Sequence, residues 1–165
     1  MKIFILLMFA GCILFSCRDS SASKELQKQQ EKEQAKRKAE RAKDFFNGII
    51  ADLKPVVTRT DSLIEKIKRF DDSESIRSYA NSNPSWSLPF SGFQMTLVDP
   101  DINGGEILKE KAQNIVQSSC DLFGFCIFYN LRYLDWQKLD SLVSSYYNNY
   151  DEFQEYQHVF MRKNQ

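Results

Sequence analysis

The sequence predicts an all-α protein: a small helical bundle or a set of helical hairpins, with a long charged helix at its N-terminal end and an irregular central loop at about residues 80–105. Two observations favour this fold class. Apolar residues recur at alternating spacings of four and three over residues 35–70 and 108–136, which places them on one face of a helix. The chain also holds only 6 Gly and 4 Pro among 165 residues, and most of these lie in the loop.

The first segment, residues 1–16, has the pattern of a secretory signal. Lys2 supplies a positive charge, and an apolar run follows from Ile3 to Phe15, as a signal requires before its cleavage site. The run closes on a relaxed bacterial lipobox, Leu14-Phe15-Ser16-Cys17. Its second residue is larger than is usual there. We expect residues 1–16 to be removed and Cys17 to carry lipid, including an acyl chain such as palmitate.

Two other interpretations of this segment stay open on the sequence. Cys12 follows the small pair Ala10-Gly11, but a cut there would shorten the apolar run and leave three apolar residues in the mature chain. An uncleaved membrane helix would need roughly 20 apolar residues to cross the hydrocarbon core, and the run is shorter. The cut before Cys17 is therefore favoured, and a multiply acylated Cys17 would fix the protein firmly to a bilayer.

Two polar segments separate the lipidation site from the body in sequence. Residues 17–23 contain three serines and are expected to form a flexible tether. Residues 24–44 lack Gly and Pro and consist largely of Lys, Glu, Gln, Ala and Arg, which predicts a polar, basic helical spacer. The helical domain then covers residues 45–165.

The lipobox, the serine-containing tether, the Lys/Glu/Gln-rich helix and the Gly-poor body rich in Asn, Tyr and Phe resemble the small surface lipoproteins of Lyme-disease spirochaetes. The resemblance is specific over Met1 to about Lys43 and compositional elsewhere. It implies an outer-membrane, surface-exposed location and contact with host molecules. It carries no binding residues over to this chain.

Charge is distributed unevenly, although the whole chain balances 22 basic against 22 acidic residues. Residues 24–43 hold eight basic and four acidic residues, whereas residues 71–165 hold seven basic and thirteen acidic ones. The basic block suits an anionic polysaccharide or lipid headgroup, and it equally suits a solvated helix with a supporting Glu33–Arg37 pair. Because the protein is expected to be exported, nucleic acid is not an expected partner.

An apolar seam follows the heptad rule through the next helical region. Its members are Ala35, Ala39, Ala42, Phe46, Ile49, Leu53, Val56, Thr60, Leu63, Ile67 and Phe70. The seam fits a coiled coil with a partner or with a second copy of itself, or packing against the rest of this chain, and we expect the last. Pro55 lies inside the seam and predicts a kink or a break at Lys54-Pro55.

Asp71-Asp72-Ser73 ends this seam and is expected to cap a short helical turn through Tyr79. The loop of residues 80–105 follows, with one short strand expected at residues 93–98. Its aromatic residues are candidates for a binding surface or for packing onto the helices: Trp86, Phe90 and Phe93.

The end of the loop matches part of an EF-hand. Asp99, Asp101, Asn103, Gly104 and Glu110 fall at positions one, three, five, six and twelve of such a loop. However, Glu106 occupies the normally aliphatic position eight, and neither an entering helix nor a second loop accompanies the stretch. A turn before the N-terminus of a helix explains it better, so no metal or cofactor is expected.

A second seam with the same spacing predicts a helix from Glu106 through Trp136, and the two seams are expected to pack together. Its members are Leu108, Ala112, Ile115, Ser119, Leu122, Cys126, Tyr129, Tyr133 and Trp136. The apolar pattern then continues to Phe160, where Asn148-Asn149 predicts a boundary between two short helices. The many tyrosines of this region suit recognition or the edge of a helical core.

Cys120 and Cys126 are the cysteines that remain beyond the lipidation site. On a helix they would be about 9 Å apart along the axis, beyond the roughly 7 Å limit between the Cα atoms of a disulfide. A disulfide therefore requires a break at Gly124, and two buried thiols are the alternative.

Catalysis is not expected. His158 has no nucleophile beside it in sequence, and the paired serines at 118–119 and 144–145 lie in helical patterns, not at a nucleophile elbow. The sequence predicts a lipoprotein anchored to the bilayer of the outer membrane through Cys17, which binds a host protein or an anionic polysaccharide. The alternative is a structural, coiled-coil lipoprotein inside the cell envelope.

Overall fold

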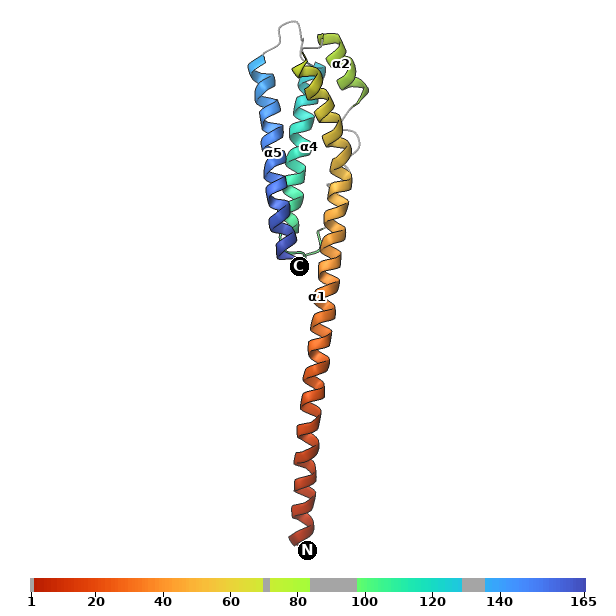
Figure 1. Ribbon diagram of the computed structural model, residues 1–165, viewed down its shortest axis with the longest axis vertical. Helices are drawn as coiled ribbons and strands as arrows, with labels where there is room; N and C mark the ends of the chain where they lie inside the picture. The colour runs from red at the N-terminus through yellow and green to blue at the C-terminus, as the bar shows by residue number, and fades with distance from the viewer. Residues whose placement is uncertain (1, 70–71, 84–97, 129–135) are drawn as a thin grey trace. The chain divides into compact units, whose positions relative to one another are not determined.

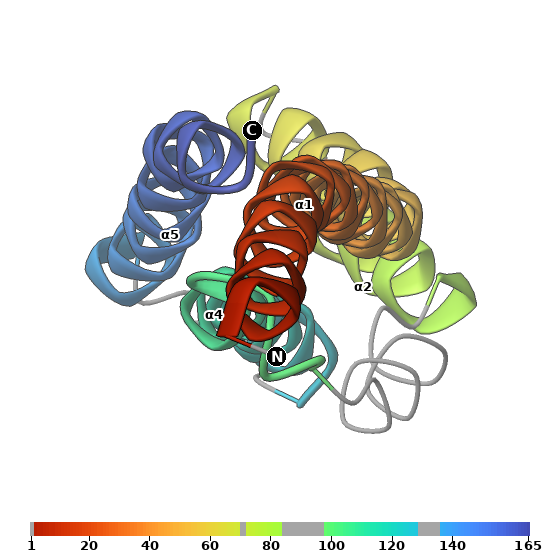
Figure 2. The same ribbon diagram turned by 90° about the horizontal axis from the view of Figure 1, so that it is seen from below.

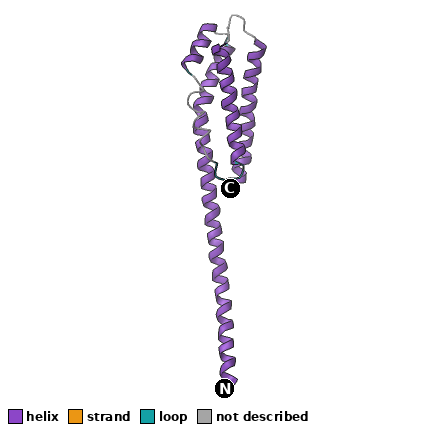
Figure 3. Cartoon of the chain, turned by 180° about the vertical axis from the view of Figure 1, so that it is seen from behind, coloured by secondary structure: helices purple, strands orange, loops and turns teal. Residues whose placement is uncertain are grey.

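The computed structural model describes residues 2–69, 72–83, 98–128 and 136–165, and the side chains among them except those of residues 2–21 and 73. Four helices account for nearly all of this part of the chain: α1 (Lys2–Lys68), α2 (Ser73–Ser82), α4 (Gly105–Phe128) and α5 (Trp136–Lys163). Within the described ranges every regular element is helical (Figures 1 and 3). The predicted all-α fold class is confirmed.

The chain divides into two compact units, residues 1–40 and residues 41–165. All the buried apolar residues found in the described part of the chain lie between Ala42 and Phe160. The second unit therefore contains the core, and a chain that begins at Lys24 retains all of it.

Helix α1 includes residues 17–23, for which the sequence predicts a flexible tether. This segment contains neither Gly nor Pro, so no residue interrupts the helix. The following segment, residues 24–44, is helical as expected. Its side chains are exposed as far as Arg37, because their Lys, Glu and Gln content leaves no apolar face to bury.

Pro55 does not break α1, so of the predicted kink or break the break does not occur. Proline removes the hydrogen bond to the carbonyl four residues earlier, which here belongs to Ala51. Both Ala51 and Pro55 are exposed, so water can solvate that carbonyl, and the buried residues on the opposite face keep the helix continuous. The Thr58 hydroxyl donates to the Lys54 carbonyl at 2.9 Å, a local bond typical of bent helices.

Helix α2 begins where the capping residues predict. The Asp72 carboxylate accepts hydrogen bonds from the backbone N–H groups of Glu74 and Ser75 at 3.1 and 2.8 Å, which satisfies two free donors of the first turn. Ile76 and Ala80 are buried, and α2 packs against α4. The helix continues to Ser82, three residues beyond the expected end.

Residues 84–97 include Trp86, Phe90, Phe93 and most of the expected strand, and they lie outside the described residues. The turn that follows is described. The Ile102 N–H donates to the Asp99 carbonyl at 2.9 Å, and the Gly105 N–H donates to the Ile102 carbonyl at 3.2 Å. Gly104 has φ of 75°, a conformation that favours glycine. The predicted turn before a helix is thus confirmed, and α4 starts at Gly105.

The C-terminal half of the second seam differs from the prediction. Helix α4 ends at Phe128 and α5 begins at Trp136. The two helices lie side by side in Figures 1 and 2 and do not form one continuous helix. Tyr129 and Tyr133 lie outside the described residues, and Trp136 is about half exposed. The sequence contains no Gly or Pro between these positions, so local signals do not indicate the end of α4.

Helix α5 also passes through Asn148-Asn149 without the predicted boundary. Asn148 is exposed, and the Asn149 side-chain amide donates to the Asn114 carbonyl of α4 at 3.2 Å. The flanking Tyr146 is buried and Tyr147 packs against the core. Tertiary contacts on both sides of the asparagine pair therefore outweigh its weak helix preference.

The two seams pack inside this chain, as expected. From α1 the buried members are Ala42, Ile49, Leu53, Val56, Thr60, Leu63 and Ile67, and from α4 they are Leu108, Ala112, Ile115, Ser119, Leu122 and Cys126. Each seam contributes one polar residue at its centre. The Thr60 hydroxyl donates to the Val56 carbonyl at 2.8 Å, so Ser119 donates to the Thr60 oxygen at 2.6 Å. This buried pair fixes the register of α1 against α4.

A helix long and apolar enough to span a bilayer was not found in the part of the chain that the structure describes.

Candidate functional site

The candidate functional site is a groove between α1 and α5 with a volume of about 350 Å³. Two contacts between these helices bound it. At one end Phe45 and Phe46 pack on Phe160, with ring centroids 6.3 and 6.1 Å apart. At the other end the Tyr146 hydroxyl donates to the Asp61 carboxylate at 3.4 Å. The groove is the space between these two contacts that the facing side chains do not fill.

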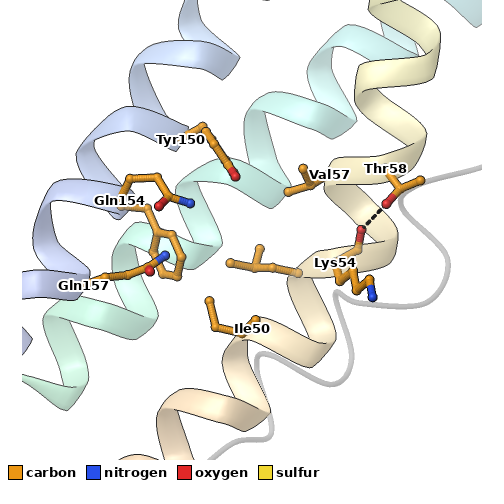
Figure 4. Close-up of a pocket in the computed structure, with 9 residues that line it drawn as sticks. Ile50, Lys54, Val57, Thr58, Tyr150, Gln154 and Gln157 are labelled. Carbon is orange, nitrogen blue, oxygen red and sulfur yellow. Dashed lines mark hydrogen bonds between the residues drawn. The ribbon is translucent and has the colours of Figure 1, made fainter. Parts of the chain in front are cut away.

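The groove has an apolar floor with polar residues along it. Its lining residues are Ile50, Leu53, Lys54, Val57 and Thr58 from α1 and Tyr150, Phe153, Gln154 and Gln157 from α5. Leu53 and Phe153 belong to the core. Figure 4 shows Ile50 and Val57 on α1 facing the ends of the Tyr150, Gln154 and Gln157 side chains. The spacing of these α5 residues by three and four places them on one helix face.

Gln157 has the least satisfied polar group of the groove. Its side-chain amide nitrogen is buried and has no hydrogen-bond partner in the structure. A buried donor without an acceptor costs roughly 1–3 kcal/mol, and most buried polar groups in proteins are paired. The amide nitrogen has almost no accessible surface, so it lies behind the wall of the groove and does not face its open volume.

The groove has one charged lining residue. Among its nine lining residues, Lys54 is the cationic side chain and none is acidic. Lys54 is exposed. Figure 4 shows its side chain on the side of α1 away from Tyr150, Gln154 and Gln157, so its ammonium does not lie in the groove.

Cys17, the predicted lipidation site, lies within the sequence of α1, and its side chain is outside the described residues. The predicted basic block is exposed on the same helix. Arg37 pairs with Glu33 at 2.7 Å, and both side chains are more than half exposed. Such a pair stabilises a helix by only a few tenths of a kcal/mol, which matches the solvated-helix interpretation and leaves the neighbouring lysines accessible.

The EF-hand-like residues make contacts with the protein itself. The Arg41 guanidinium lies 2.6 Å from Asp99 and 3.6 Å from Asp101. The Asn103 backbone N–H and side-chain amide donate to Asn164 and to the Lys163 carbonyl at 3.1 and 3.4 Å. These residues join the start of α4 to α1 and to the C-terminus. No cluster of three or more His, Cys, Asp or Glu side chains suited to a metal ion was found among the described residues.

Cys120 and Cys126 are not joined by a disulfide. Helix α4 continues through Gly124, so the break that a disulfide requires does not occur. Cys126 is fully buried and Cys120 is partly buried against the core. Burial raises the pKa of the Cys126 thiol to about 12. The alternative of two buried thiols is therefore correct for Cys126 and only partly so for Cys120. Cys126 is an apolar core residue in its protonated form.

The described tyrosines mostly serve the bundle. Tyr146 is buried, and burial together with the neighbouring Asp61 charge raises the pKa of its hydroxyl far above the ordinary value. The Tyr79 hydroxyl donates to the Arg59 carbonyl, and the Tyr156 hydroxyl donates to the Gly104 carbonyl, both at 3.3 Å. These hydroxyl groups lie at the edge of the core. Tyr150 differs from them because it also lines the groove.

The remaining residues considered for catalysis do not converge. His158 is exposed on α5, whereas Ser118 and Ser119 are buried in α4. The Ser118 hydroxyl donates to the Asn114 carbonyl at 2.9 Å, and Ser119 pairs with Thr60. Ser144 and Ser145 are exposed on α5.

Sequence reasoning did not predict the groove. The polar pair Gln154 and Gln157 beside Tyr150 and Phe153 is a recognisable signal, because glutamines at helical spacing replace apolar residues on a face that is otherwise buried. Which helix faces them depends on how α1 and α5 pack, and the heptad pattern does not specify that.

Comparison with known proteins identified no relatives: no family profile, no curated protein and no solved structure matches this chain.

Proposed function

We propose that this protein is a lipid-anchored binding protein of the bacterial outer membrane, attached through Cys17, with the helical unit of residues 41–165 as its interaction module. The sequence from Lys2 to Cys17 supplies the anchor. The partner bound at the cell surface is a host protein or an anionic polysaccharide.

The observation that carries the proposal is the contrast between the lipobox and the segment after it. Residues 22–37 are helical with exposed side chains, so this segment contributes nothing to the core. A polar segment with that property between an acylated cysteine and a folded unit suits a spacer. It would let the unit bind partners away from the bilayer surface.

The runner-up is a coiled-coil lipoprotein that joins a partner helix inside the envelope. The structure weakens the support that the seam gives to this function, because the seam residues from Ala42 to Ile67 are mostly buried in this chain's own core. Size measurement of a Lys24–Gln165 chain tests the homotypic form. We expect a monomer, and a stable dimer would favour the runner-up.

Labelling with radioactive palmitate tests the anchor. We expect the wild-type chain to incorporate label and to partition into detergent, whereas the Cys17→Ser variant incorporates none. The Cys12→Ser variant is the matched control and should incorporate label normally. Loss of label in the Cys12 variant alone would mean that Cys12, and not Cys17, carries the lipid.

Protease treatment of intact cells that make the protein tests the surface location. The account predicts that the protein is degraded together with a known surface marker while a periplasmic marker survives. Survival of the protein under the same treatment would contradict a surface role and favour the runner-up.

Heparin retention tests the basic block as a polysaccharide site. Replacing Lys36, Arg37 and Lys38 by Gln removes three exposed or half-exposed positive charges, and each contact to an anionic polymer adds to the salt dependence of binding. We expect elution at lower salt for the triple variant and no change for the matched control Lys109→Gln on α4. Elution of the triple variant at the same salt concentration as the wild type would contradict a polysaccharide site in the basic block and favour a host protein as the partner.

A further inference from the structure

We propose that one face of α1 binds a linear sulfated polysaccharide along a row of four lysines: Lys24, Lys28, Lys32 and Lys36. These four residues are called the lysine row below. The site rests on the surface location proposed above. It narrows the proposed partner to a polysaccharide and assigns the helix face that binds it.

The helix places the four lysines in line. They recur at every fourth position, and α1 is one continuous helix through all of them (Figure 1). A spacing of four residues advances about 6 Å along the helix axis and turns about 40° around it. The row is therefore about 18 Å long, and its members lie within about 120° of the helix circumference. All four side chains are exposed.

The net positive charge of residues 24–43 is concentrated on the side of the helix that carries the row. The period of 3.6 residues per turn assigns each charged residue to one side. The opposite side carries two arginines and two glutamates, so its charges cancel: Arg37, Arg41, Glu33 and Glu40. The side of the row carries six lysines and two glutamates. The whole surplus of positive charge in this segment therefore lies there.

The fold supplies no counter-charges to the lysine row. Two other pairs of residues four apart join a glutamate to an arginine, Glu33 to Arg37 at 2.7 Å and Glu65 to Arg69 at 3.4 Å. The row instead repeats three like-charged pairs at this spacing, and like charges so placed destabilise a helix. None of the four lysines forms an ion pair with a described residue. An anionic chain bound along the row would reduce this repulsion.

The face that carries the row lacks the apolar surface that other partners need. A helix that lies in a membrane interface buries an apolar face, and the centre of a protein–protein interface is apolar with few charges. Leu26 is the one large apolar residue among residues 24–40, and helix periodicity places it on the opposite side. A ligand of this face gains charge contacts and hydrogen bonds, and a sulfated polysaccharide offers both along its length.

The rest of the chain and the turn of the row also favour this partner. Residues 71–165 hold seven basic and thirteen acidic residues, so they repel a polyanion and direct it to the row. A linear polysaccharide can follow the turn of about 40° between successive lysines. A flat bilayer surface cannot follow it and contacts best the charges on a single line along the helix.

A variant of unchanged composition and net charge separates the row from simple charge attraction. It combines Lys28→Gln, Gln29→Lys, Gln30→Lys and Lys32→Gln, and it leaves no two lysines four residues apart among residues 24–38. Lys and Gln have similar helix propensity, so helix content by circular dichroism should not change. The host is the Arg18–Gln165 chain, which retains the whole core and begins before the row.

Isothermal titration with heparin in low salt measures the effect. We expect the rearranged variant to bind about three- to tenfold more weakly than the wild type, with a shallower dependence of affinity on salt. Replacing all four lysines of the row by Gln should weaken binding by about tenfold or more. The single change Lys109→Gln on α4 is the control outside the row and should leave the affinity unchanged. Fully desulfated heparin should bind the wild type about tenfold or more weakly than heparin.

Wild-type affinity in the rearranged variant would overturn the proposal, because binding would then depend on net charge and not on the row. Equal affinity for heparin and desulfated heparin would overturn it as well. Binding to phosphatidylglycerol vesicles that requires the row, without binding to heparin, would assign the row to a lipid surface instead. None of these results bears on palmitate labelling of Cys17 or on protease treatment of cells, so the lysine row and the surface location fail independently.

Discussion

Two stretches of the same helix, residues 22–40 and residues 41–68 of α1, follow the same backbone geometry and differ in what their side chains do. In the first, Ala35 is exposed and Ala39 is only half-buried. In the second, the seam positions from Ala42 to Ile67 are mostly buried. Both stretches have heptad spacing, yet only one belongs to a core.

The difference shows that helix formation and packing have separate causes in this chain. Lys, Glu, Gln and Ala have high helix propensity and form a helix without tertiary contacts of their own. Packing requires apolar area, and burial contributes roughly 25 cal/mol per Å². Alanine offers too little area, whereas Ile49, Leu53 and Leu63 offer enough. Spacing alone predicts the face, and side-chain size predicts whether the face is buried.

The largest effect on stability is expected from one of two Leu→Ala changes in the same helix, and the pair tests this comparison. Leu63 is 0% exposed and Leu26 is 59% exposed. We expect Leu63→Ala to lower the free energy of unfolding by about 2–5 kcal/mol and Leu26→Ala to change it by less than about 0.5 kcal/mol. Urea unfolding of both variants measures the difference, and similar losses would refute the separation.

The buried hydroxyl pair sharpens the comparison within the core. Thr60→Val deprives the Ser119 hydroxyl of its acceptor, whereas Ser119→Ala leaves the Thr60 hydroxyl donating to Val56. We therefore expect the Thr60 change to cost about 1–3 kcal/mol and the Ser119 change to cost less. In a double-mutant cycle the combined loss should be smaller than the sum. Additive losses would mean that the two hydroxyl groups do not interact.

A smaller effect concerns pH at the α1–α5 contact. Burial raises the pKa of Asp61 above its ordinary value of 3.8, although the Tyr146 hydrogen bond and Lys68 oppose the shift. Between the ordinary pKa of the unfolded chain and the raised pKa of the folded chain, the folded chain therefore binds more protons. Stability falls as pH rises through that window. Asp61→Asn should lose less stability between pH 4 and pH 7 than the wild type. An equal loss in both chains would contradict this assignment.

The smallest effect is expected in the exposed stretch. Replacing Lys36, Arg37 and Lys38 by Gln breaks the exposed pair with Glu33, which contributes only a few tenths of a kcal/mol. The midpoint of urea unfolding should therefore stay within experimental error of the wild type. A clear loss of stability would mean that this stretch has partners in the fold.

The helical fold was predictable from local signals that tertiary structure reinforces. The seam members between Ala42 and Cys126 are spaced and sized for burial, and Asp72 is a strong N-cap residue. A break at Pro55 and a boundary at Asn148-Asn149 do not occur, because local propensity suggested them and the buried faces of α1 and α5 override it. The Cys120–Cys126 disulfide depended on a break at Gly124, and glycine alone is too weak a helix breaker inside a packed helix.

The groove was beyond local reasoning. Gln154 and Gln157 signal a polar strip on α5, but the sequence does not show that this strip faces Ile50 and Leu53 of α1, about 100 residues earlier in the chain. The lipobox is the opposite case. It is a purely local signal around Cys17, whose consequence is chemical and does not depend on the fold.

The measurement that tests the division of α1 most directly compares the stability of two chains, Lys24–Gln165 and Arg37–Gln165. The shorter chain keeps one helical turn before Arg41, which pairs with Asp99, and it retains every core residue. The account predicts free energies of unfolding that agree within about 0.5 kcal/mol. A loss of more than about 2 kcal/mol in the shorter chain would show that residues 24–36 stabilise the fold and are not a spacer.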